Sequence, residues 1–183
     1  MAFAILDVYS VSIILPNTYP SQLPVVYEVG GRLPRKPDHH INPDGSACVM
    51  IPDDRWRCFS IGAPFLDYLD GPLHNFFLSQ TSFSETGTWP FGQWEHGVKG
   101  IYEYYQCLIG IKDNLTVCRF LQILAKNNLK KHYDCPCASG KIIKHCCLNK
   151  IRDLRGKVSI EVATKARLQL CQARIFYERS RLR

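Results

Sequence analysis

The stretch VYSVSIILPNTYPSQLPVVYEV, residues 8–29, decides the fold of the N-terminal part of the chain. Its first eight residues largely alternate apolar and polar side chains, which predicts a half-buried β-strand over residues 8–15. Two prolines then flank a tyrosine in PNTYP, which cannot continue a strand ladder because proline has no N–H. Residues 24–29, PVVYEV, predict a second strand. The short connection between the two strands predicts an antiparallel hairpin.

Helical patterns follow the strands. Residues 73–80, 98–109 and 114–124 place apolar side chains at helical spacing, and residues 151–176 indicate two further helices. In the third segment we expect Asn114 to be the N-cap. The buried stripe expected on that helix consists of Leu115, Cys118, Leu121 and Leu124. Strands followed by helices predict an α+β fold.

The composition indicates an ordinary soluble globular protein. The chain has 183 residues, of which 46% are hydrophobic and 21% charged, enough for one core or for a core plus a small appendage. No apolar run approaches the roughly 20 residues of a membrane-spanning helix, and no signal peptide opens the chain. We therefore expect a cytoplasmic protein with reduced cysteines. Its nine cysteines then indicate metal binding, catalysis or burial rather than disulfides.

The net charge of +7 is unevenly distributed. Residues 1–125 carry eight basic and twelve acidic residues, whereas residues 126–183 carry fifteen basic and four acidic residues, a net of +11. Such a basic segment suits nucleic acid, an anionic membrane surface or an acidic protein, and it is equally compatible with a solvated face. Its interspersed acids and few aromatics argue against nucleic-acid binding by base stacking. We expect two domains, residues 1–125 and 126–183.

Residues 135–147, CPCASGKIIKHCC, contain a dense cluster of cysteines. The candidate ligands are Cys135, Cys137, Cys146 and Cys147. Thiolates at this density repel one another unless a cation neutralises them, and tetrahedral zinc takes four sulfurs. His145 is an alternative to one of the cysteines. A four-ligand site has no vacant position, so we expect the zinc to be structural and not catalytic.

The segment DCPCASGKIIKHCCL resembles the SEC-C motif, which is named from the zinc-binding tail of the SecA secretion ATPase and is appended to many bacterial proteins. The four ligand positions match one for one. The resemblance implies a small zinc knuckle in a helical tail, used for stability or docking.

Cys48 lies in an irregular, proline-rich stretch, residues 33–54. A structureless loop of about twenty residues in a compact domain is usually functional. Cysteine is the most nucleophilic side chain at neutral pH, and the neighbouring His39, His40 and Arg35 would favour a thiolate or polarise a carbonyl. The residues alone leave both a catalytic and a silent cysteine open.

The order of these motifs resembles that of the ubiquitin-conjugating enzyme (UBC) family. The matching positions are Pro16, Tyr19, Pro20 and Pro24 for its P-x-x-YP-x-x-x-P segment, and Gly45, Ser46, Ala47 and Cys48 for its Gly-x-x-Cys loop. Residues 71–105 look like the downstream region of bacterial members, which are encoded in CBASS-type anti-phage defence systems with cGAS-like nucleotidyltransferases, or in ubiquitin-like conjugation operons. The resemblance covers about residues 8–110 and implies an antiparallel sheet flanked by helices.

Carried over from that family, Cys48 would accept a protein C-terminus as a thioester and transfer it to a lysine amine on a target. The implied donor is a ubiquitin-like modifier or a cGAS-like nucleotidyltransferase. The protein must hold the carbonyl and stabilise an oxyanion. Eukaryotic members have His-Pro-Asn ten to eight positions before the cysteine, whereas this chain has Asp38-His39-His40. His40 or Asn42 is the candidate replacement for the oxyanion donor.

A second departure concerns the start of the chain. The family's N-terminal helix and first strand are absent, because Met1 leads almost directly into the strand that matches the family's second. That helix normally contacts the activating enzyme, so we expect either acyl transfer without an ordinary activating enzyme or a truncated chain. The alternative function is a non-catalytic adaptor with a UBC-like fold, which docks a protein partner through its zinc knuckle and basic tail.

Overall fold

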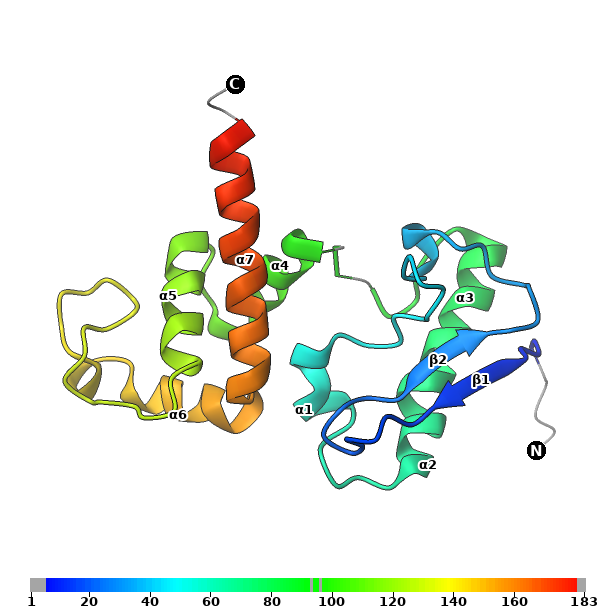
Figure 1. Cartoon of the computed structure of the whole chain (residues 1–183), viewed down its shortest axis with the longest axis horizontal. Helices are drawn as coiled ribbons and strands as arrows, with labels where there is room; N and C mark the ends of the chain where they lie inside the picture. The colour runs from blue at the N-terminus through cyan, green and yellow to red at the C-terminus, as the bar shows by residue number, and fades with distance from the viewer. Residues whose placement is uncertain (1–5, 93, 96, 181–183) are drawn as a thin grey trace. The chain divides into compact units, whose positions relative to one another are not determined.

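The computed structural model describes residues 6–92, 94–95 and 97–180, and divides the chain into two compact units, Met1–Gln93 and Trp94–Arg183 (Figure 1). The N-terminal unit contains the sheet. Strands β1 (Val11–Ile14) and β2 (Val25–Glu28) pair in antiparallel orientation, with Ile14 opposite Val25. The predicted hairpin is therefore confirmed.

The rest of the N-terminal unit is helical or irregular. Its helical segments are η1 (Pro37–His39), η2 (Pro52–Asp54), α1 (Arg55–Cys58), α2 (Phe65–Tyr68), η3 (Leu69–Leu73) and α3 (His74–Thr86). The last three run on without a break, because the π-helical turn η3 accommodates Pro72, which has no N–H to donate. Helix α3 ends at Gly87, whose φ of 69° lets its N–H return to the carbonyl of Phe83.

The sheet packs against the continuous segment from α2 to α3 through an aromatic and aliphatic core. The buried residues of this core are Val26, Phe59, Tyr68 and Leu73. The rings of Tyr9 and Phe77, with centroids 4.7 Å apart, join the approach to β1 to α3. A small antiparallel sheet covered by helices confirms the α+β class.

The C-terminal unit is built from helices. They are α4 (Gly97–Ile109), α5 (Asn114–Leu124), η4 (Ile143–His145), α6 (Leu148–Lys157) and α7 (Ile160–Ser180). Helices α4, α5 and α7 contact one another, and α6 contacts α5. The predicted helices over 98–109 and 114–124 and the two C-terminal ones are therefore present. Among the described residues, no helix is both long enough and apolar enough to cross a bilayer.

The boundary between the two units differs from the expected domain boundary. The sequence placed it between residues 125 and 126, whereas the compact units meet at Gln93 and Trp94. Helices α4 and α5 belong to the C-terminal unit because their apolar faces pack against α7. Charge does not distinguish the two boundaries, because residues 94–125 carry three basic and three acidic residues, a net of zero.

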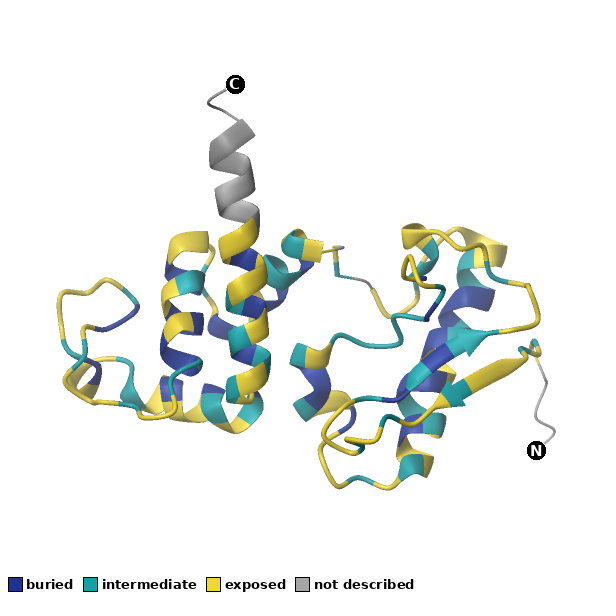
Figure 2. Cartoon of the chain, in the orientation of Figure 1, coloured by how far each residue is buried: buried dark blue, intermediate teal, exposed yellow. Residues whose placement is uncertain are grey.

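Helix α5 corrects two details of the sequence analysis. Its N-cap is Asp113 rather than Asn114, because the Asp113 carboxylate accepts hydrogen bonds from the N–H of Thr116 at 2.8 Å and from its hydroxyl at 2.7 Å. Leu121 and Leu124 are buried as expected, and the other buried residues of the helix are Thr116, Val117, Phe120 and Ile123. Leu115 and Cys118 are not among the buried residues, and Leu115 is 46% exposed. Figure 2 shows buried and exposed residues in turn along α5.

The burial pattern of α5 makes a prediction about stability. Leu121 is fully buried, so Leu121→Ala should remove packed apolar area, leave a cavity and lower the free energy of unfolding by about 2–5 kcal/mol. Leu115→Ala, on the same helix, is the matched control and should change it by less than about 0.5 kcal/mol. Urea denaturation followed by circular dichroism measures both. Equal losses from the two variants would contradict this helix register.

Candidate functional site

The four clustered cysteines lie on two short turns that face each other. Cys135 and Cys137 occupy the first turn, in which the N–H of Cys135 donates to the carbonyl of Lys141 at 2.8 Å. Positive φ angles at Ala138 (59°) and Gly140 (72°) reverse the chain between the two pairs. Cys146 and Cys147 follow η4 and directly precede α6.

The sulfur atoms form a set of metal-binding size. All four lie within 4.8 Å of one another. The Sγ atom of Cys137 is 3.3 Å from that of Cys135 and 3.4 Å from that of Cys146, which is 3.7 Å from that of Cys147. Zinc–sulfur bonds of about 2.3 Å in a tetrahedron place the sulfurs about 3.8 Å apart. The four cysteines therefore suit a metal ion such as zinc.

Thiols of this cluster differ in pKa, which bears on how they would bind a cation. Hydrogen bonding by Ser139 lowers the pKa of Cys137 to about 6. Burial, followed by the neighbouring sulfurs, raises the pKa of Cys147, and burial likewise raises that of Cys135. One thiolate therefore forms readily while two neighbouring thiols retain their protons. A bound divalent cation would offset this repulsion and favour thiolates at the coordinating positions.

The open question about His145 has a structural answer. Its ring is exposed on η4, and the group of ligand atoms close enough to share one ion consists of the four cysteines. Ser139, which the sequence analysis did not assign, donates to the Sγ atom of Cys146 at 3.3 Å. A hydroxyl next to a cysteine cluster is too common in sequences to identify this role.

Ile143 anchors the cysteine-bearing segment to the helices. Its side chain is fully buried, and its N–H donates to the carbonyl of Tyr133 at 2.8 Å. The ammonium groups of Lys126 and Lys130 lie 5.0 Å and 5.9 Å from the centroid of the Tyr133 ring. Two basic side chains therefore lie over Tyr133, two residues before the first cysteine of the cluster.

The candidate residues around Cys48 lie together on a tight hairpin. Asn42-Pro43-Asp44-Gly45 is a sequence preferred for a type I turn followed by a glycine with positive φ, and Gly45 has a φ of 86°. The N–H of Gly45 donates to the carbonyl of Asn42, and the N–H of Asn42 donates to the carbonyl of Ser46. The Asp44 carboxylate accepts from the N–H and hydroxyl of Ser46, which lowers the pKa of Asp44.

This hairpin is attached to the sheet. Tyr27 pairs with Ser46, and the N–H of Ala47 donates to the carbonyl of Val26 at 2.7 Å. Ala47 and Val49 pack against the core, and Cys48 between them is half-buried.

His40 lies opposite Cys48 on the hairpin. The N–H of Cys48 donates to the carbonyl of His40 at 2.7 Å, and the ring of His40 packs edge-on against Trp89 with centroids 4.6 Å apart. The side chain of Gln80 holds the adjacent backbone by donating to the carbonyl of His39 at 2.7 Å. Gln80 and Trp89 were not assigned from the sequence, because they follow the hairpin by more than thirty residues and act through packing and hydrogen bonding.

Asn42 and Cys48 differ in how accessible they are. Asn42 is exposed, and its amide donates to the Ser46 hydroxyl at 3.0 Å, which uses one of its two N–H groups. Cys48 is half-buried, and burial raises the pKa of its thiol above the ordinary value of 9.0. The hairpin thus brings His40, Asn42 and Cys48 into one small region and keeps the thiol protonated at neutral pH.

Comparison with known proteins gives no assignment. No family model matches the chain, and no significant match is found among curated proteins or solved structures. The chemistry of the two cysteine sites therefore rests on their own geometry.

The four-cysteine set predicts stoichiometric metal binding. Protein purified with zinc under reducing conditions should contain about one zinc ion per chain, and Cys137→Ser should lose most of it because three sulfurs remain. Cys107→Ser, at an exposed cysteine in the same unit, is the matched control and should keep the metal. Elemental analysis by mass spectrometry measures the content. Full zinc in Cys137→Ser, or none in the wild type, would contradict the site.

The raised pKa of Cys48 predicts slow alkylation at neutral pH. Thiolate is the reactive form, so Cys48 should react with iodoacetamide more slowly than free cysteine at pH 7. The rate should increase about tenfold for each pH unit below the pKa. Peptide mapping of the zinc-loaded protein, quenched after timed exposure, measures modification at this position. A rate that is already constant between pH 7 and pH 9 would contradict this result.

Proposed function

We propose that the chain is a ubiquitin-conjugating-like acyl carrier that holds a protein C-terminus as a thioester on Cys48. The observation that carries this proposal is the hairpin register, in which the backbone bond from Cys48 to His40 sets these residues opposite each other and Asn42 lies opposite Ser46. A nucleophile and two candidate donors thus come from one rigid turn. Loops held by a rigid scaffold are common places for catalytic residues.

The transfer uses two acyl-exchange steps. The sulfur of Cys48 attacks the carbonyl carbon of a donor thioester, the donor's carbon–sulfur bond breaks, and the thiol proton ends on the departing thiol. A lysine amine of the target then attacks the same carbon. The new carbon–nitrogen bond forms an amide, the bond to Cys48 breaks, and one amine proton returns to its sulfur. His40 and Asn42 are the candidate groups for stabilising the oxyanion in both steps.

The raised pKa of Cys48 suits a carrier. A thiol of higher pKa is a slower leaving group, so its thioester exchanges less readily. Partial burial also restricts the approach of water to the acyl carbon. The same environment reduces the thiolate fraction available for loading, so we expect the donor to bring its carbonyl close to the sulfur by docking.

The cysteine cluster has a separate role in this proposal. Cys135, Cys137, Cys146 and Cys147 would bind a structural zinc ion, which a closed set of four sulfurs holds without an open position for chemistry. The ion fixes the segment between α5 and α6, and the basic C-terminal unit docks a protein partner. In the setting that the family resemblance implies, bacterial antiviral defence in the cytoplasm, the donor is a ubiquitin-like modifier or a cGAS-like nucleotidyltransferase.

A non-catalytic adaptor is the second candidate. It is favoured by the protonated, half-buried state of Cys48 and by the use of the Asn42 amide within its own turn. In that case the hairpin has only a structural role. The basic C-terminal unit, with zinc bound to its four cysteines, would dock the protein partner.

Trapping at position 48 separates the two candidates. When the chain is expressed with its genomic neighbours, the wild type should carry a reductant-sensitive protein adduct, because thioesters are cleaved by thiols. Cys48→Lys should carry the same protein as a stable amide, and Cys48→Ala should carry none. Mass spectrometry of the purified chain identifies the linkage.

Cys58→Ser is the control, since Cys58 is an exposed cysteine of the same N-terminal unit. This variant should keep the adduct. A chain that never carries an acyl group at position 48, in the wild type or in Cys48→Lys, is an adaptor.

A further inference from the structure

Within the described sheet, strand β1 pairs along one of its two edges. The N–H of Val29 donates to the carbonyl of Ser10, so bonded pairs recur at Ser12 and Ile14 along β1. The backbone groups of Val11 and Ile13 consequently point away from β2. In the part of the chain that the structure describes, no other strand pairs with this side of β1.

This edge lacks the features that usually prevent strand addition. Natural edge strands are protected by charged residues, prolines or bulges. Residues 8–15 contain no charged residue and no proline. Several of their apolar side chains are exposed, namely Val8 (68%), Val11 (37%), Ile14 (53%) and Leu15 (47%). An exposed apolar edge of this kind is a template for pairing with another strand.

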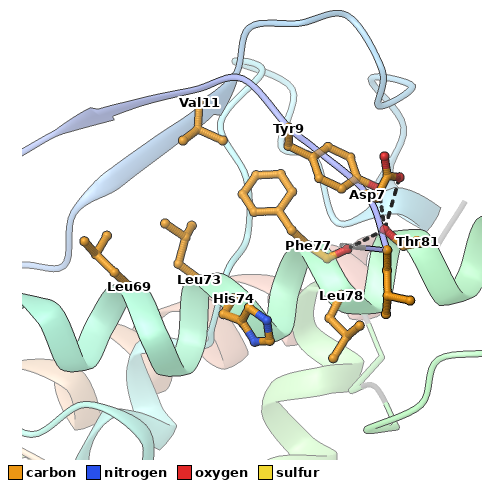
Figure 3. Close-up of a pocket in the computed structure, with 10 residues that line it drawn as sticks. Asp7, Tyr9, Val11, Leu69, Leu73, His74, Phe77, Leu78 and Thr81 are labelled. Carbon is orange, nitrogen blue, oxygen red and sulfur yellow. Dashed lines mark hydrogen bonds between the residues drawn. The ribbon is translucent and has the colours of Figure 1, made fainter. Parts of the chain in front are cut away.

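An apolar groove runs beside the same edge. A cavity of about 400 Å³ lies between the strand and the helix, with Tyr9 and Val11 on the strand side and Leu69, Leu73 and Leu78 on the helix side (Figure 3). Its helical wall extends from Leu69 to Thr81, which corresponds to about 18 Å of helix. A strand of five residues has about the same length. Alternate side chains of a strand added to β1 would therefore point into this groove.

One end of the groove is polar and acidic. The Tyr9 hydroxyl lies 2.9 Å from the Thr81 hydroxyl, which also hydrogen-bonds to Asp7. Arg32 forms an ion pair with Asp7, so that carboxylate already has a cation. A second cavity of about 300 Å³ shares Thr81 with the first and reaches Glu85. Among the described residues, Glu85 forms no salt bridge, so it is available to a basic side chain.

We propose that the free edge of β1 and the adjoining groove bind an extended peptide segment of a partner protein by strand addition. The segment pairs with the backbone of Val11 and Ile13, places alternate apolar side chains into the groove, and carries a lysine or arginine at the end near Glu85. Backbone bonds supply affinity in this mode of recognition, and pockets for alternate side chains supply specificity. The site is independent of acyl transfer on Cys48.

Charge distinguishes such a partner from a second copy of this chain. Two copies paired through β1 would bring together two N-terminal units that each carry a net charge of −4. Like charges brought together oppose association. A basic extended segment meets no such repulsion.

Hydrogen exchange on the full-length, zinc-loaded chain tests the proposal. The probes are eight-residue synthetic peptides that alternate Val, Ile or Leu with Thr and carry Lys at one end. Free protein should exchange the amides of Val11 and Ile13 quickly and those of Ser12 and Ile14 slowly, since only the latter pair with β2. A bound peptide should slow exchange at Val11 and Ile13 by at least about tenfold.

Matched controls distinguish strand addition from nonspecific hydrophobic binding of the peptides. A peptide with the same side chains but N-methylated on its pairing edge should not bind, because it cannot donate to β1. Leu78→Glu should weaken binding by about tenfold or more, whereas Leu66→Glu, at an exposed leucine away from the groove, should not. Glu85→Lys, on the exposed end of α3, should reverse the preference from Lys-ended to Glu-ended peptides.

Three results would overturn the proposal. The first is that none of the peptides binds, and the second is equal binding of the N-methylated peptide. The third is protection of Val11 and Ile13 without peptide, together with a doubled mass at increasing protein concentration. That result would assign the edge to a second copy of the chain.

Discussion

The backbone hydrogen bond from Ala47 to Val26 joins the loop that carries Cys48 to the sheet, and the geometry of the N-terminal unit depends on it. The hairpin before Cys48 is closed by its own turn, but only its attachment to β2 fixes which of its side chains face the core. Ala47 then packs against the core beside the half-buried Cys48. A shift of one residue in this register would change which side chains of the segment pack against the core.

The same unit is asymmetric about its two strands. β2 is satisfied on both sides, by β1 and by the hairpin segment at Ser46 and Ala47. Among the described strands and bridges, β1 pairs on one side only, while α3 extends beneath it and supplies more apolar surface than two strands cover. The sulfur of the candidate active site and the open edge therefore belong to different margins of the sheet, so that acyl chemistry and partner recognition would not compete for the same residues.

Local features of this fold are readable from the sequence, and long-range ones are not. The hairpin of β1 and β2, the Pro-Asp-Gly turn and the four cysteines follow from patterns within a few residues, where turn geometry and thiolate repulsion act. The boundary at Gln93 was missed because it depends on α4 and α5 packing against α7, which lies about forty residues further on. Asn114 was preferred to Asp113 as a cap because both residue types serve there, and only the bond to Thr116 distinguishes them. The burial of Cys48 likewise arises from side chains that no local motif specifies.

The cysteine cluster closes within thirteen residues, from Cys135 to Cys147, and its two turns are joined by local backbone bonds. Bringing the ends of so short a loop together costs little entropy compared with closing a loop that spans a domain. Binding of an ion such as zinc would thus require no long-range contact between the cysteines, and the segment could fold soon after it leaves the ribosome. Helix α7, which is synthesised afterwards, would then pack onto a C-terminal unit in which the segment 135–147 has already folded.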